Sequence, residues 1–199
     1  MIKEFSDQTL SDVVDLHMKV LHWSINARLG RSHVMNLYSI LVHDNNTFGC
    51  VYYQNDLAIA FLVGTKNSKT TRKRIFSSYN LITKCKLLFQ SFGNFFDLID
   101  LFENQFLIPV VLGRLEIQAE LLTMVADSDN VISPFAIVKC YNRMLSRYNQ
   151  LGFNYCYGQV AFNPNPSIYR FYQTDGAQLI KSFIRNKIYK ISAVKKRMY

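Results

Sequence analysis

The stretch that decides the fold is residues 120–141, ELLTMVADSDNVISPFAIVKCY. It reads as an apolar strand, an acidic and polar turn, and a helix opened by Pro134. Strand, turn and helix in this order usually direct backbone N–H groups and a helix N-terminus at an anion. This turn has no glycine and no basic residue. It therefore has the layout of a phosphate-binding loop without the usual chemistry.

Length and composition favour one soluble globular domain. The chain has 199 residues, 49% of them apolar and 19% charged, which is enough to bury a sizeable core and too apolar for disorder. A formal net charge of +9 implies an anionic partner. Nucleotide phosphates, an acidic carrier protein, nucleic acid and a lipid surface all satisfy that charge, so charge alone does not choose among them.

The cysteines argue against a metal site. Cys50, Cys85, Cys140 and Cys156 are far apart and lack paired ligand spacing. We expect reduced thiols and a cytoplasmic protein without a metal. The most apolar region, residues 87–112, is interrupted by three acidic residues, so we expect no transmembrane segment.

Working outward from residues 120–141, hydrophobic periodicity predicts alternating helices and strands. Strands are expected at 1–5, 48–53, 57–65, 114–126 and 153–162, with a closing hairpin at 177–194. Helices are expected at 10–21, 32–43, 134–152 and 165–176. Residues 66–112, basic at first and aromatic later, predict two helices broken near Gly93 and inserted between strands.

This order of elements resembles the GNAT acyltransferase superfamily. DLHMKVLHWSINARLGRSHVMNLYSILV (15–42) is similar to the opening of a subgroup found among polysaccharide and sugar-modification genes. FGCVYYQNDLAIAFLVGT (48–65) resembles its second and third strands, and AELLTMVAD (119–127) its fourth. NPSIYRFYQTDGA (165–177) follows the late motif of the family, in which an asparagine precedes a tyrosine by seven residues and a glycine by eleven. The resemblance covers almost the whole chain.

The resemblance implies one GNAT-like α/β (α+β) domain over residues 1–199. Its central mixed, mostly antiparallel sheet would have splayed fourth and fifth strands and flanking helices, with a helical insertion at about 66–112. The implied activity is N-acyl transfer, most simply of acetyl, from a pantetheine thioester such as acetyl-CoA or another acyl-CoA to an amine. The subgroup suggests an amino sugar, free or nucleotide-linked, as the acceptor.

The phosphate loop departs from the family pattern, which is Arg/Gln-Gly-x-Gly-x-Gly/Ala after the fourth strand. In register this chain has V-I-S-P-F-A at residues 131–136, and only Ala136 is an accepted family residue. Backbone that approaches phosphate closely favours glycine, and Pro134 lacks an N–H donor. Asp127 and Asp129 add negative charge. We therefore expect a degenerate loop and weak coenzyme A binding.

The resemblance also implies contacts to the donor. Backbone at Met124, Val125 and Ala126 would pair with the pantetheine arm like an added strand, although an ordinary core strand would look the same. The loop contacts would come from Ser133, Phe135 and Ala136. Asn165 would contact the pantetheine arm, and its alternative is a helix N-cap before Pro166.

Two residues are implied to be catalytic. Tyr172 is at the position of the general acid that protonates the leaving thiolate, and its alternative is packing in an aromatic run. Glu120 is at a position used for a general base. A carboxylate inside an apolar strand is costly unless it is paired or functional. The alternative for Glu120 is an ion pair with a neighbour such as Arg114.

The remaining polar signals are weaker. The four histidines have no ligand spacing with an acidic partner, which favours core or surface roles. In the family, the loop containing His22-Trp23 commonly lines the acceptor pocket. The basic stretch 65–74 is either a solvated face or a rim that attracts phosphates.

Two rival functions remain open. One is a catalytically impaired member of the fold, kept as a binding or regulatory protein. The other is an acyltransferase that takes its donor from an acyl carrier protein held by the basic surface. Nucleic-acid binding ranks last, because the charge is present but no recognisable motif is.

Overall fold

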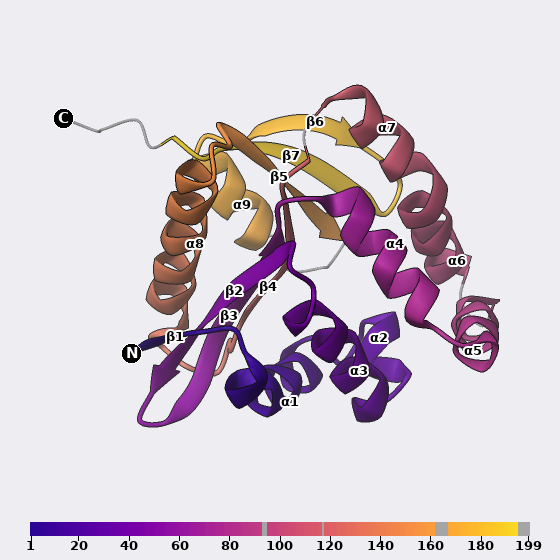
Figure 1. Cartoon of the computed structure of the whole chain (residues 1–199), viewed down its shortest axis with the longest axis horizontal. Helices are drawn as coiled ribbons and strands as arrows, with labels where there is room; N and C mark the ends of the chain where they lie inside the picture. Colours follow the sequence, from indigo (N-terminus) through magenta and orange to yellow (C-terminus); the bar gives the residue numbers. More distant parts are fainter. Residues whose placement is uncertain (93–94, 117, 162–166, 195–199) are drawn as a thin grey trace.

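The computed structural model describes residues 1–92, 95–116, 118–161 and 167–194. One mixed seven-stranded sheet forms the centre, in the order β1-β2-β3-β4-β5-β7-β6 (Figure 1). Its strands are β1 (Ile2–Glu4), β2 (Thr47–Gln54), β3 (Leu57–Thr65), β4 (Glu120–Ala126), β5 (Tyr155–Ala161), β6 (Gln178–Ser182) and β7 (Asn186–Ser192). All neighbours are antiparallel except β4 and β5, which are parallel. The predicted α/β architecture is confirmed.

Helices cover both faces of the sheet. After β1, the chain forms η1 (Asp7–Thr9), α1 (Leu10–Val20), the short α2 (Ile25–Arg28) and α3 (Arg31–Val42). Side chains alternate along a strand. Accordingly, Phe61 and Val63 of β3 pack with α1 and α3, whereas Leu62 packs on the opposite face with α8 (Ser133–Gln150). The core therefore has two layers, one on each side of β3.

The β2–β3 hairpin forms where the sequence predicts it. Asn55 and Asp56 both have positive φ, 49° and 60°. Two such residues in a row match the twist of the flanking strands, and asparagine and aspartate tolerate this conformation better than most residues. The hairpin places β3 beside β4, which it meets from Ala60 to Thr65.

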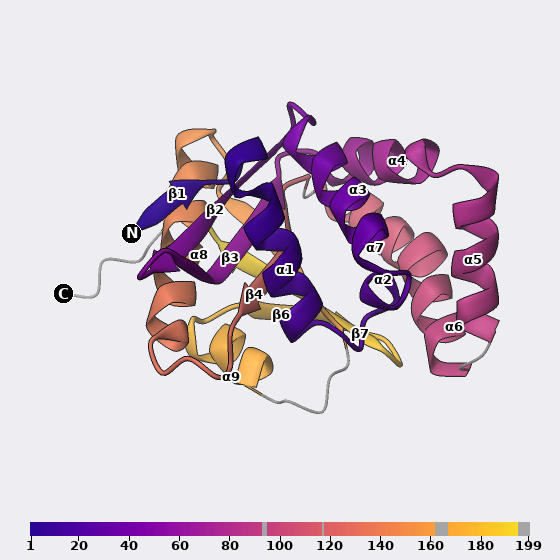
Figure 2. The ribbon, with the colours of Figure 1, turned by 90° about the horizontal axis from the view of Figure 1, so that it is seen from below.

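The insertion between β3 and β4 has more helices than predicted. It consists of α4 (Ser68–Ser78), α5 (Leu81–Phe92), α6 (Phe95–Phe102), a π-helical stretch (Glu103–Leu107) and α7 (Ile108–Arg114). The prediction missed the break after α4, where Asn80 caps α5 by accepting a hydrogen bond from the Thr83 amide at 2.8 Å. The strand expected from residue 114 begins only at Glu120. These helices gather at one end of the molecule (Figure 2).

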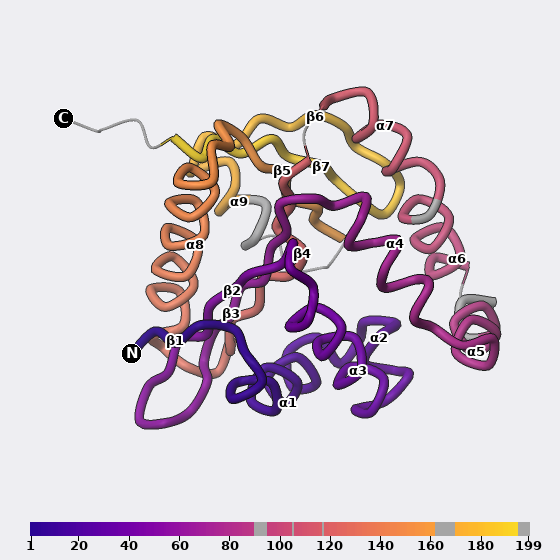
Figure 3. Tube along the Cα trace, viewed as in Figure 1, coloured from indigo at the N-terminus to yellow at the C-terminus, as the bar shows by residue number. Residues whose placement is uncertain are grey.

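A long helix connects the two parallel strands. The chain leaves β4, passes through a loop into α8, and returns as β5 (Figure 3). Gly152, with a φ of 84°, follows the end of α8 as predicted. This crossover allows the parallel pairing, which antiparallel hairpins cannot provide. The last helix, α9 (Ser167–Thr174), lies between β5 and β6 in sequence.

Candidate active site

The two parallel strands separate soon after they meet. Their ladder has only two register pairs in the described part of the chain, Glu120 with Tyr157 and Leu121 with Gly158. The register between β3 and β4 shifts at the same place, from Leu121 to Thr123, so Leu122 is an extra residue on β4. Such a bulge bends its strand. Beyond Leu121, the ladders among the described residues therefore pair β4 with β3 but not with β5.

The residues expected to contact the donor arm lie on this free part of β4. Met124 and Ala126 are half-buried and Val125 is buried. All three line a cavity of about 2570 Å³ between the sheet, α1, α2 and the insertion. Backbone exposed at the edge of a sheet can accept an extended ligand as an added strand. This part of β4 therefore offers an edge to which an extended ligand can add.

Tyr172 lies at the point where β4 and β5 begin to separate. A β-carbon built on Gly158 would be 2.7 Å from the Tyr172 hydroxyl oxygen, so that hydroxyl lies against the last paired residue of β5. The ring stacks on Tyr189 with centroids 5.3 Å apart, and the side chain lines the cavity. Burial, aided by Cys156 and Asp175, raises the pKa of Tyr172. The phenol therefore holds its proton at neutral pH.

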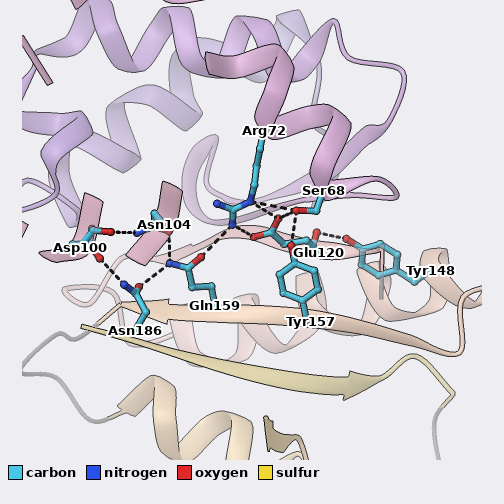
Figure 4. A network of polar contacts seen from close by, with 9 residues as sticks. All are labelled: Ser68, Arg72, Asp100, Asn104, Glu120, Tyr148, Tyr157, Gln159 and Asn186. Atoms are coloured by element: carbon cyan, nitrogen blue, oxygen red, sulfur yellow. Dashed lines mark hydrogen bonds and ion pairs between the residues drawn. The ribbon is translucent and has the colours of Figure 1, made fainter. Parts of the chain in front are cut away.

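Glu120 is fixed by side chains from the insertion (Figure 4). The Ser68 hydroxyl donates to Glu120 Oε2 at 2.5 Å, and Arg72 Nε donates to the same oxygen at 3.2 Å. Arg72 Nη2 forms an ion pair with Glu120 Oε1. The Tyr157 hydroxyl in turn donates to Ser68. Glu120 thus forms the ion pair that the sequence left open, and the partner is Arg72 rather than Arg114.

The network continues from β5 into β7 and the insertion (Figure 4). Gln159 accepts a hydrogen bond from Arg72 at 3.1 Å and donates to Asn104 and Asn186, both at 2.7 Å. Asn186 donates to Asp100 at 2.7 Å. Amide side chains can donate and accept at once, which suits them to linking several elements. This chain of contacts holds the insertion against the sheet.

Sequence reasoning missed Ser68, Arg72 and Gln159. The basic stretch 65–74 was interpreted as a solvated face or a phosphate rim. A local signal was present, since Ser68 and Arg72 are four residues apart and therefore share one face of α4. Their partner Glu120 is distant in sequence, so periodicity alone could not pair them.

The loop at the phosphate position uses its amides internally. The Asp129 amide donates to Asp127 Oδ1 at 3.2 Å, and the Ile132 amide donates to Asn130 Oδ1 at 2.9 Å. Backbone carbonyls of Asn130 and Ile132 accept the amides of Ser133 and Ala136. Four donors that could face an anion thus already have acceptors within the protein.

Charge in the loop is also compensated within the chain. Lys19 Nζ lies 2.9 Å from Asp127 and 3.1 Å from Asp129. The side-chain hydrogen bonds that Lys19 donates to these two carboxylates raise its pKa. The Phe135 ring is exposed beneath Lys139 Nζ at 4.4 Å. The two loop carboxylates thus already have a cationic partner in Lys19.

The cavity brings most of the predicted residues together. Those on its wall are Glu120, Met124, Val125, Ala126, Ser133 and Tyr172. Phe135 and Ala136 belong to the first turn of α8 but are not among the lining residues. Asn165 lies outside the described residues.

One buried histidine faces this cavity. His17 Nδ1 lies 2.8 Å from the Tyr38 hydroxyl, and its Nε2 lies 3.4 Å from Ser24 Oγ. Burial, with a smaller effect of His33, lowers the pKa of His17 to about 4. His17 is therefore a neutral, hydrogen-bonded side chain at neutral pH. His22 and Trp23 line the same cavity.

The described residues have neither a metal-binding cluster nor a helix that could span a membrane. Within the described ranges, no cluster of three or more His, Cys, Asp or Glu side chains could hold a metal ion. In that same part of the chain, none of the helices has the length and apolar character needed to cross a bilayer.

Comparisons with known proteins give structural likeness only. No protein-family model and no curated protein sequence matches the chain. A protein from Desulfovibrio desulfuricans assigned to the GNAT family of acetyltransferases is similar at a TM-score of 0.59 and 9% identity, covering 98% of this chain and 100% of that one. The aminoglycoside 6'-N-acetyltransferase of Enterococcus faecium gives 0.58 at 9% identity, with 98% of each chain covered.

A third similar structure is the PaiA N-acetyltransferase of Thermoplasma acidophilum in complex with coenzyme A. It has a TM-score of 0.55 and 10% identity, covering 96% of this chain and 99% of that one. Likeness at such low identity concerns the backbone and not the activity. The chain has the fold of the GNAT N-acetyltransferases.

Proposed function

We propose that this protein is an N-acyltransferase that moves an acyl group from a pantetheine thioester to an amine. The observation that carries the proposal is the split between β4 and β5, with the Tyr172 hydroxyl at its end against Gly158. Unpaired backbone and a protonated phenol at one point can hold a thioester carbonyl and protonate its sulfur. The fold shared with N-acetyltransferases supports the same activity.

The reaction needs no covalent enzyme intermediate. The amine nitrogen attacks the thioester carbonyl carbon, a C–N bond forms, and the C–S bond breaks. Backbone at Met124, Val125 and Ala126 would orient the donor and polarise its carbonyl. The departing thiolate would take the phenolic proton of Tyr172, which solvent later restores. The products are an amide and a free thiol.

The amine must also lose a proton, and Glu120 is the proposed acceptor. Both of its carboxylate oxygens already accept hydrogen bonds from Ser68 or Arg72. A direct transfer would therefore require one of these partners to move. The Ser68 hydroxyl lines the cavity and donates to Glu120, so it would relay the proton once Tyr157 or Arg72, which both donate to its oxygen, has moved. It would accept the amine proton while passing its own proton to Glu120.

Donor recognition is expected to differ from that of enzymes with a glycine-rich loop. The proposed contacts at Ser133, Phe135 and Ala136 are few, because the loop amides are largely engaged. Each missing hydrogen bond costs about 0.5–3 kcal/mol, whereas an exposed helix N-terminus contributes about 0.3–1 kcal/mol. We propose that coenzyme A binds weakly through this loop, with Asn165 contributing a contact to the pantetheine arm.

An acyl carrier protein is the second proposed donor, and the occupied loop amides favour it. A carrier protein presents pantetheine without the adenosine phosphates and is acidic, which suits a chain of net charge +9. Calorimetric titration of the protein with coenzyme A and with holo-carrier protein, at low and at moderate salt, compares its affinity for the two donors. Tight, salt-independent coenzyme A binding would contradict the account of this loop.

The proposed acceptor is an amine, and an amino sugar is the preferred class. The subgroup resemblance suggests it, and one structural neighbour carries the name of an aminoglycoside acetyltransferase. The transfer test uses acyl-CoA and acyl-carrier donors with a panel of amines that includes free and nucleotide-linked amino sugars. Mass spectrometry should find an amide with one thiol released per amide. Thiol release without any amide would contradict transfer, and donor binding without either product would favour a non-catalytic binding protein.

A further inference from the structure

The cavity beside the split is much larger than an acetyl group needs. Its volume is about 2570 Å³, which also has to hold the donor arm at β4 and the acceptor, whereas a single small-molecule site usually has about 300–1,000 Å³. It begins at β4, where Leu122 and Met124 line it, and extends between α1, α2 and the insertion. A group attached to the thioester carbonyl would therefore enter this chamber directly from the reacting position.

The chamber has large apolar side chains on its walls. These include Leu21, Trp23, Ile25, Phe76, Leu87 and Leu88. Trp23 is 40% exposed and Phe76 is 48% exposed. Aromatic side chains with this much exposure inside a concave site gain free energy when an apolar ligand covers them.

Charged groups on the same walls include two ion pairs and three lysines, Lys69, Lys73 and Lys84. Arg28 pairs with Asp97 at 2.5 Å, and Arg72 pairs with Glu120. Paired charges do not demand a charged ligand in the way that an uncompensated charge does. The lining surface as a whole is nevertheless mainly apolar.

We propose that the chamber takes a long aliphatic acyl chain carried by the thioester donor. This inference rests on the proposed acyl transfer and names its acyl group. A long chain would also compensate for the donor affinity lost at the phosphate loop, because each buried methylene strengthens binding about threefold to fourfold. The chain, rather than the phosphates, anchors the donor. The bonds formed and broken are those of the transfer described above.

Trp23 makes the proposal measurable without turnover. It is the single tryptophan of the chain and lines the chamber, so its fluorescence reports an apolar ligand there. The probes are acetyl, octanoyl, dodecanoyl and palmitoyl ketone analogues of acyl-pantetheine, in which a methylene separates sulfur from the carbonyl. They cannot transfer the acyl group. We expect affinity to rise with chain length, with a blue shift of Trp23 emission for the long chains.

Two matched variants locate the chain. Phe76→Gln removes an aromatic wall of the chamber on α4, and Phe89→Gln changes a phenylalanine on α5 that is 77% exposed and does not line it. The first should weaken dodecanoyl binding about tenfold, with acetyl binding unchanged. The second should leave both affinities unchanged. Both sites are accessible to solvent, so neither variant should prevent folding.

The outcomes separate this inference from the proposed function. Equal affinity for all chain lengths, with transfer of acetyl still observed, would overturn the long-chain inference and leave acyl transfer standing. Failure of every analogue to bind would count against the donor site itself. If dodecylamine with an acetyl donor shifted Trp23 emission while donor chain length had no effect, the chamber would belong to the acceptor and the inference would be wrong.

Discussion

The Tyr172 hydroxyl lies so close to the α-carbon of Gly158 that an added β-carbon would be 2.7 Å from its oxygen. Any larger residue must therefore displace a buried, stacked ring. Gly158→Ala should lower the free energy of unfolding by roughly 1–3 kcal/mol and also reduce turnover. Chemical unfolding and an activity assay check this. Gly113→Ala is the matched control, because its added β-carbon meets no atom within 4 Å. Unchanged stability of Gly158→Ala would contradict the close contact.

Tyr172→Phe should lower turnover about a hundredfold and leave donor affinity nearly unchanged. A phenol that protonates the leaving sulfur acts mainly in the transition state. Steady-state kinetics and analogue binding measure the two effects separately. Tyr141→Phe is the control, since its hydroxyl donates to Asp175 at 2.5 Å in the same aromatic cluster but does not line the cavity. Weaker donor binding at normal turnover would make Tyr172 a packing residue.

The Arg72–Glu120 pair should be strongly coupled. Glu120 is 1% exposed, so Arg72→Met would leave a buried carboxylate without its cation. The Arg72 side chain keeps 28% exposure, and we therefore expect a loss of about 1–3 kcal/mol in unfolding free energy. Combining Arg72→Met with Glu120→Gln should recover part of it.

A double-mutant cycle by urea unfolding measures this coupling. Arg31→Met is the comparison, because Arg31 pairs with Asp15 on an exposed surface, where solvent screens the pair and its loss should cost much less. Additive effects of the Arg72 and Glu120 changes would show that the pair is not a unit. If Glu120→Gln and Ser68→Ala both kept normal turnover and normal pH dependence, the proposed proton path would be wrong.

His17 should make the protein sensitive to mild acid. Above pH 6.5 it is neutral in both the folded and the unfolded chain. As pH falls from 6.5 to about 4, the unfolded chain binds a proton that the folded protein excludes, so the unfolding free energy decreases. Below pH 4 both states are protonated and this loss stops. The total is roughly 3 kcal/mol.

Unfolding in urea at several pH values between 4 and 7.5 measures the slope of the unfolding free energy against pH. His17→Gln should make the unfolding free energy less dependent on pH. Because burial also lowers the pKa of His33, some slope should remain in the His17 variant. An unchanged slope in His17→Gln would show that His17 does not carry this effect.

Much of the backbone could be predicted from the sequence, because it depends on local patterns. Alternating apolar residues and the turn at Asn55 and Asp56 predicted the hairpin, and Gly152 predicted the end of α8. The order of elements predicted the divergence of β4 and β5. The insertion was miscounted because Asn80, which caps α5, was not recognised as a helix start.

The candidate site was harder to predict, because its contacts join distant parts of the chain. Ser68 meets Glu120 across 52 residues, and Arg72 meets Gln159 across 87. Residue spacing reports only neighbours along one element. Similarly, the loop sequence showed missing glycines, but only the structure showed that Asp127 and Asn130 accept its amides.

The most direct test of the central claim, that the split between β4 and β5 binds a thioester donor, uses the six methionines of the chain. With methionine methyl groups labelled for NMR, the protein is titrated with the ketone analogues of acyl-pantetheine. Met124 lines the cavity at the split, whereas Met144 is a buried residue of α8 and does not line it. The account predicts a saturable shift of the Met124 signal, with Met144 nearly unchanged. A saturating ligand that leaves Met124 unmoved would contradict it.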